Sequence, residues 1–295
     1  MGYLLLLFAL LSGAVKGFCG KKLGGYATNL QSAVLLNLIR MLLCVALGFT
    51  VLFLTGDFEH FTINSKVLFV SALSGISTSF FVVSWLLSVR KSAYMMLDVF
   101  LMMGTLIPML AGYFLFSEPV SIRQWIGFVI LVIAALIMCS YNNSIKTKLS
   151  FSSILLLIAC GFSNGITDFS QKLYVKSFPN LPVSMFNLYT YIFAAVTLAI
   201  FFVFRIRKEK IHFDGRESKV SFLIIFVMAV ALTANSQFKT MAASHLNSAQ
   251  LYPMNQGAAL VLSTLMANFF FKEKFTFKAF VGILLAFVAL ILMNL

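Results

Sequence analysis

The chain has 295 residues, of which 61% are hydrophobic and only 11% are charged, and its formal net charge is +13. A soluble domain carries about 25% charged residues because water must wet its surface, so this composition excludes a soluble globular protein. The basic residues lie in short loops between apolar runs, which is typical of membrane proteins and argues against a nucleic-acid partner.

Clusters of charges, Gly, Asn and Pro divide the chain into apolar runs, each close to the roughly 20 residues that a membrane-spanning helix needs. The first run has no basic segment before it, so it is expected to be a mature helix rather than a signal peptide. The predicted fold class is an all-α membrane protein with ten transmembrane helices. The predicted spans are 3–20, 31–54, 66–88, 93–116, 122–140, 151–174, 183–204, 219–243, 247–271 and 277–294.

The chain repeats internally, because polar and glycine positions recur in the same order in both halves. Glu118 and Glu273 lie 155 positions apart in similar surroundings. The same offset pairs Gly127 with Gly282, and an offset of 151 pairs Ser12 with Ser163 and Lys21 with Lys172. A unit of five helices places its second copy upside down, so we expect two inverted five-helix repeats, 1–145 and 146–295. Secondary transporters commonly have this architecture, with the substrate site near the midplane between the halves.

The late-repeat segment LYPMNQGAALVLSTLMANFFFKEKFTFKAFVGILLAFVAL has a Pro early in the ninth span, a Glu beyond it and a Gly in the tenth. In this pattern the chain resembles the drug/metabolite transporter superfamily, specifically its ten-helix EamA-type members. The positions that carry the resemblance are Pro253, Glu273 and Gly282, with Glu118 and Gly127 in the first half and Arg40 in the second span. The first half departs from the pattern, with Asp98 where the second half has Pro253. The resemblance implies the fold but hardly the substrate, since the family covers amino acids, nucleotide sugars, cationic drugs and other metabolites.

The basic residues also predict an orientation. Loops that follow odd-numbered spans carry fifteen Lys and Arg residues, and the loops on the other side carry five. The positive-inside rule therefore places the fifteen in the cytoplasm and both termini outside. The family resemblance implies the opposite orientation, so the two indications disagree.

Polar side chains inside the spans predict a binding site, because such groups are costly in lipid and tend to face a partner or a cavity. They form stripes on the first, third, fourth, sixth, eighth and ninth spans, which we expect to surround one central cavity. The candidate substrate-binding residues are Lys16, Trp85, Tyr94, Asp98, Asn164, Asp168, Gln171, Asn235, Lys239, Tyr252, Asn255 and Gln256.

The two intramembrane aspartates allow two interpretations. They can recognise a cation or couple transport to protons, or they can form structural ion pairs, Asp168 with Lys16 or Asp98 with Lys239. A cationic or zwitterionic solute is favoured, and the lysines leave an anionic solute open.

Other polar and Pro positions are expected to be structural. Arg40 is expected to pack between helices or reach an interface, and Glu118 and Glu273 to fix the turns that follow them. Ser121 with Gln124 predicts a capping box, and Pro108 and Pro253 predict kinks. The four cysteines are expected to be small packing residues.

The predicted function is a secondary active transporter, a permease or efflux protein, that moves a small polar metabolite or amphipathic cation by alternating access. The alternatives are a lipid-carrier translocase and, less favoured, an intramembrane enzyme, for which the sequence offers no catalytic motif. No cofactor, metal or catalytic residue is expected. The expected setting is the bacterial plasma membrane, with lipid and a small-molecule substrate as partners, together with an open possibility of proton or ion coupling and of a homodimer. The direction of transport is not predicted.

Overall fold

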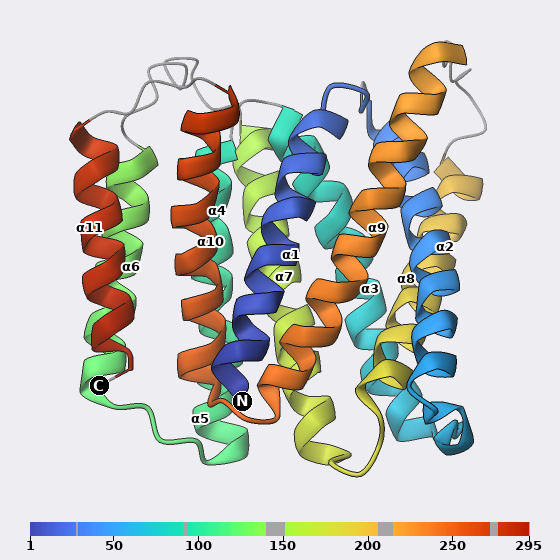
Figure 1. Ribbon diagram of the computed structural model, residues 1–295, viewed down its shortest axis with the longest axis horizontal. Helices are drawn as coiled ribbons and strands as arrows, with labels where there is room; N and C mark the ends of the chain where they lie inside the picture. The colour runs from blue at the N-terminus through green and yellow to red at the C-terminus, as the bar shows by residue number, and fades with distance from the viewer. Residues whose placement is uncertain (28, 91–93, 140–150, 206–214, 272–276, 295) are drawn as a thin grey trace.

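The computed structural model describes residues 1–295 except 28, 91–93, 140–150, 206–214, 272–276 and 295 (Figure 1). Its helices lie side by side in one bundle. They are α1 (Gly2–Leu23), α2 (Leu30–Leu54), α3 (Ser65–Arg90), α4 (Tyr94–Gly104), α5 (Leu106–Phe116), α6 (Ile122–Cys139), α7 (Phe151–Ser177), α8 (Val183–Arg205), α9 (Gly215–Ala243), α10 (Ser248–Phe271) and α11 (Phe277–Leu292), with a 3-10 turn, η1 (Asp57–His60), between α2 and α3.

All ten predicted spans coincide with helices, and the fourth is divided into α4 and α5. By length and composition, seven helical segments in the described ranges can cross a membrane, and two shorter apolar stretches lie in α6 and α11. Both termini lie at one end of the bundle, which we call the terminal end (Figure 1, bottom). The helices that precede the basic loops end at the other end, which we call the basic end.

The break between α4 and α5 follows from Pro108. Proline has no N–H group, so it cannot donate a hydrogen bond to the carbonyl of Gly104 four residues earlier. The chain instead forms a tight turn in which the N–H and the hydroxyl of Thr105 both donate to the Met102 carbonyl, at 3.0 and 2.7 Å. The fourth span, where a kink was predicted at Pro108, is divided at this turn, whereas α10 continues through Pro253 without a break.

Helices α4 and α7 cross with their backbones in direct contact because glycines occupy the crossing. A methyl group added to Gly161 would overlap the carbonyl oxygen of Phe100, and one added to Gly104 would overlap that of Gly161. A methyl group on Gly165 would in turn overlap the carbonyl oxygen of Gly104. Small residues at a crossing allow this close approach within a membrane. The crossing therefore requires glycine at these three positions.

We predict that Gly161→Ala destabilises the protein by about 3 kcal/mol, since backbone atoms cannot move aside as a side chain would. Unfolding in mixed detergent micelles measures this difference. Gly25→Ala is the matched control, because its added methyl group meets only the Lys22 carbonyl oxygen at 3.5 Å. Equal stability of the two variants would contradict the described crossing.

Candidate functional site

A cavity lies inside the bundle between α1, α3, α4, α7, α9 and α10, with a volume of about 110 Å³. These are the helices of the six spans whose polar stripes predicted a common cavity. On α1 the lining runs from Ala9 to Lys21, and on α10 it runs from Asn255 to Met266. The cavity thus extends from the middle of the bundle towards the basic end.

Most of the predicted binding residues lie together at this cavity. The eight that line it are Lys16, Trp85, Asp98, Asn164, Asn235, Lys239, Asn255 and Gln256. Asp168, Gln171 and Tyr252 are buried but do not line it. The side chain of Tyr94 lies outside the described residues.

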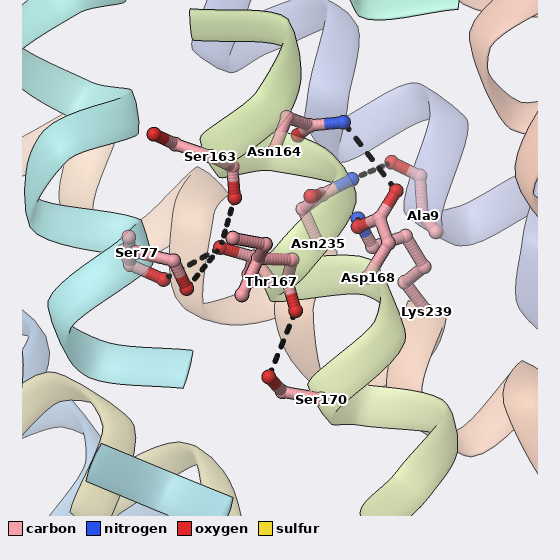
Figure 2. A network of polar contacts seen from close by, with 11 residues as sticks. Ala9, Ser77, Ser163, Asn164, Thr167, Asp168, Ser170, Asn235 and Lys239 are labelled. Carbon is pink, nitrogen blue, oxygen red and sulfur yellow. Dashed lines mark hydrogen bonds and ion pairs between the residues drawn. The ribbon is translucent and has the colours of Figure 1, made fainter. Parts of the chain in front are cut away.

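Asp168 and Lys239 form a buried ion pair beside the cavity (Figure 2). The Lys239 ammonium donates to Asp168 Oδ1 at 2.5 Å, and the Asn164 amide lies 3.4 Å from Oδ2. Asn164 and Asp168 are one turn apart on α7, so both face α9. This pairing differs from the two that were considered from the sequence. It compensates the charge of Asp168 within the protein.

Two further polar contacts join helices around the cavity. Asn235 on α9 donates to the Ala9 carbonyl on α1 at 2.6 Å, and Ser263 on α10 donates to Asp98 on α4 at 3.2 Å. Ser263 was not predicted, although it lies two turns beyond Asn255 on the same helical stripe. The helical spacing between Asn255 and Ser263 could have identified Ser263 as a cavity residue.

Aromatic cavity residues were also missed. Phe18 on α1 and Phe81 on α3 line the cavity, and Lys16 Nζ lies 5.9 Å from the centre of the Phe81 ring. Phenylalanine is abundant throughout the apolar spans, so the sequence gives no signal that separates these two from lipid-facing neighbours.

A second polar cluster joins α7 to α3 (Figure 2). The Thr167 hydroxyl oxygen lies 3.1 Å from Ser77 Oγ and 3.0 Å from the Ser163 carbonyl oxygen. Thr78 Oγ1 lies 3.4 Å from Thr167 Oγ1. Hydroxyl groups that bind one another and the backbone satisfy their hydrogen-bonding capacity away from water, so this cluster stabilises helix packing.

Glu118, at the terminal end, holds several helices together. Its Oε1 lies 2.7 Å from Lys172 Nζ and 3.2 Å from Lys176 Nζ, while Oε2 accepts a hydrogen bond from the Ser248 N–H at 2.7 Å. Lys172 also donates to the carbonyls of Ala243 and Leu246. The Glu118 cluster, as we call Glu118, Lys172 and Lys176, therefore joins the α5–α6 loop to α7, to the end of α9 and to the start of α10.

The prediction that Glu118 fixes the turn after it is wrong, because its side chain binds α7 and α10 instead. The following turn is held by Ser121 and Gln124, whose reciprocal hydrogen bonds of 2.9 and 3.2 Å confirm the predicted capping box. Glu273 lies outside the described residues.

The surroundings of Glu118 favour its charged form. Burial alone would raise the pKa of this carboxyl, but hydrogen bonds from Lys172 and from the Ser248 N–H outweigh burial and hold the pKa below its ordinary value. A carboxyl whose pKa is lower in the folded state stabilises the fold at neutral pH, and this stabilisation is lost as the pH falls through the lowered pKa. Acid is therefore expected to release the cluster.

An apolar floor separates the cavity from the terminal end. We give this name to Leu5, Leu6, Tyr174, Leu246 and Leu251, which are buried in one hydrophobic cluster. The floor lies next to the Glu118 cluster, since Lys172 binds the Leu246 carbonyl. The cavity is consequently closed towards the terminal end by both apolar packing and ion pairs.

Arg40 and the described cysteines are packing residues. Arg40 is 2% exposed and contacts Met228, so it packs between helices and does not reach an interface. Cys19, Cys44 and Cys160 are free and buried, as packing residues are. Among the described residues there is no group of three or more His, Cys, Asp or Glu that could hold a metal ion.

Comparison with known proteins identifies the second half of the chain. Residues 151–295 match the EamA-like transporter family, which confirms the family resemblance seen in the sequence. Among 28 matching chains of solved structures, one described as "Crystal structure of protein" superposes with a TM-score of 0.74 at 12% sequence identity. The superposition covers 99% of this chain and 95% of that chain, and it shows the fold alone. No curated protein matches the sequence.

We predict that Asp168→Asn destabilises the protein by about 3–5 kcal/mol, because it leaves the Lys239 ammonium buried without its counter-charge. The double variant Asp168→Asn/Lys239→Gln is expected to recover most of this loss, since it removes both charges. Chemical unfolding of the single and double variants in detergent measures the coupling. Additive effects of the two substitutions would show that the ion pair does not contribute as described.

Proposed function

We propose that this EamA-type membrane transporter moves a small polar metabolite across the membrane by alternating access through the cavity. The observation that carries the proposal is the asymmetry of the cavity. It reaches Lys21 and Met266 at the basic end but is closed towards the terminal end by the apolar floor and the Glu118 cluster. A polar site open to one side only is the arrangement that alternating access requires.

The packing of the helices supports two inverted repeats. An axis that exchanges the halves would place α1 on α7 and α9 on α3. The contact of α1 with α9 would then become the contact of α7 with α3, and both contacts are extensive. The same axis would relate α2 to α8 and α6 to α11, and the members of each pair pack against each other. In the second pair, Gly127 lies against Ala289 and Met293. We infer that the halves rock against each other about this axis.

The repeat also supplies counterparts to the Glu118 cluster. Glu273 corresponds to Glu118 and Lys21 to Lys172 in the two halves of the sequence. Residue 273 lies outside the described part of the chain, so its partners are not defined. We propose that the two ends close alternately, with the Glu118 cluster broken when the terminal end opens.

The orientation follows from the basic loops. The positive-inside rule places the basic end in the cytoplasm and the terminal end outside, so the described conformation would be open to the cytoplasm. We also propose that the protein lies in the bacterial plasma membrane and that a proton or another ion drives transport.

We predict that Glu118→Gln increases opening of the terminal end about tenfold, because it removes charge-assisted hydrogen bonds that are worth roughly 1.5–3 kcal/mol. The measurement is the labelling rate of a Ser248→Cys reporter by a membrane-impermeant maleimide added outside intact cells, with the four native cysteines replaced by serine. Ser248 is 1% exposed, so its labelling requires opening.

Two controls make the measurement specific. Ser244→Cys, which is exposed at the same end, should be labelled at one rate in every background. Glu59→Gln removes an exposed carboxylate outside the cluster and should leave the Ser248→Cys rate unchanged. Equal rates in the Glu118→Gln and parent proteins would refute closure by the cluster, and labelling only in inverted vesicles would reverse the proposed orientation.

A further inference from the structure

Lys16 lines the cavity on α1 and has no ion-pair partner among the described residues. Its nearest described aromatic contact is the Phe81 ring, 5.9 Å from Nζ to the ring centre. Lys239, the other lysine at mid-cavity, is already bound to Asp168 at 2.5 Å. The two ammonium groups therefore differ, because only Lys16 is available to a ligand.

Arg40 adds a second cation behind Lys16. Its side chain is 2% exposed, its Nη1 lies 3.3 Å from Met228 Sδ, and its Nε has no hydrogen-bond partner in the described part of the chain. A sulfur atom is a weak acceptor and carries no compensating charge. Arg40 and Lys16 lie within electrostatic range of each other.

The charges around Lys16 do not balance. Lys239, Arg40 and Asp168 interact electrostatically with Lys16, and Asp98 also lines the cavity, so the three cations outnumber the two carboxylates. Asp98, the second intramembrane acid, accepts a hydrogen bond from Ser263 on the α4–α10 side.

An excess of positive charge within a membrane protein is costly unless a counter-charge accompanies it. We propose that the cavity takes a substrate with a carboxylate or phosphate group, and that Lys16 binds this group. The proposal rests on the transport function proposed above and assigns its substrate class. It departs from the cationic or zwitterionic solute favoured from the sequence, because Asp168 is bound to Lys239.

The rest of the lining fits the remainder of such a substrate. Phe18, Phe81 and Trp85 present aromatic surface on the α1 and α3 sides, next to Lys16. Lys21 lies further along α1, where the cavity lining reaches towards the basic end. The inferred substrate is a small organic anion with an apolar or aromatic body.

The chain contains a spectroscopic reporter for this inference. Of its two tryptophans, Trp85 lines the cavity, while Trp125 on α6 is 38% exposed on the outside of the bundle. In a Trp125→Phe variant, all tryptophan fluorescence therefore comes from the cavity. Iodide is an anionic quencher, caesium is a cationic quencher and acrylamide is a neutral quencher. Comparing the three reports the electrostatic potential at Trp85.

We expect iodide to quench Trp85 at least about twofold more strongly than caesium, because local positive potential concentrates anions. Lys16→Gln should remove this preference, Lys16→Arg should keep it, and Lys66→Gln, which removes an exposed lysine outside the cavity, should not change it. Equal quenching by the two ions, stronger quenching by caesium, or an unchanged preference in Lys16→Gln would overturn the inference.

A matched pair of organic probes tests the substrate class itself. 3-Phenylpropionate should protect Trp85 from acrylamide at roughly tenfold lower concentration than 3-phenylpropylammonium, and Lys16→Gln should abolish the difference. Better protection by the ammonium probe, or none by either, would refute an anion site while leaving transport of another solute intact. If acrylamide itself failed to reach Trp85, the water-accessible cavity on which the proposed function depends would be refuted.

Discussion

The cost of placing charge in lipid governs this structure. The spans carry few charged side chains, and Arg40, Asp168, Lys172 and Lys239 are buried within the bundle. Asp168 is paired with Lys239, and Asp98 is held by Ser263. These contacts also join helices from different parts of the chain, so the requirement to satisfy polar groups brings the polar stripes to one cavity.

The contact of α4 with α7 and that of α1 with α10 are packed differently. Where α4 crosses α7, glycines bring the backbones into contact, whereas residues of both α1 and α10 line the cavity. Under the proposed exchange of halves, these two helix pairs correspond. One conformation can therefore have a tight crossing on one side and an open seam on the other. The Glu118 cluster adds ion pairs at the closed end, and these can break and re-form without repacking a core.

The sequence predicted the ten spans and most of the polar residues that line the cavity, because helical length, loop charge and polar stripes depend on local periodicity. It could not predict the partner of Asp168, since the register of α7 against α9 decides whether Lys16 or Lys239 lies within reach. The role of Glu118 was missed for the same reason, because Ser248 is 130 residues away in the chain. Phe81 was missed because an aromatic residue facing a cavity and one facing lipid look alike in sequence.

If the two ends of the bundle open in alternation, paired distance measurements will show opposite changes at the two ends. Spin labels at Lys22 and Phe269 report the basic end, between α1 and α10, and labels at Tyr113 and Ser177 report the terminal end, between α5 and α7. All four positions are exposed, so labelling leaves the core intact. We expect that conditions which shorten the first distance, such as acid that releases Glu118, lengthen the second. One fixed distance at both ends, or changes in the same direction, would contradict it.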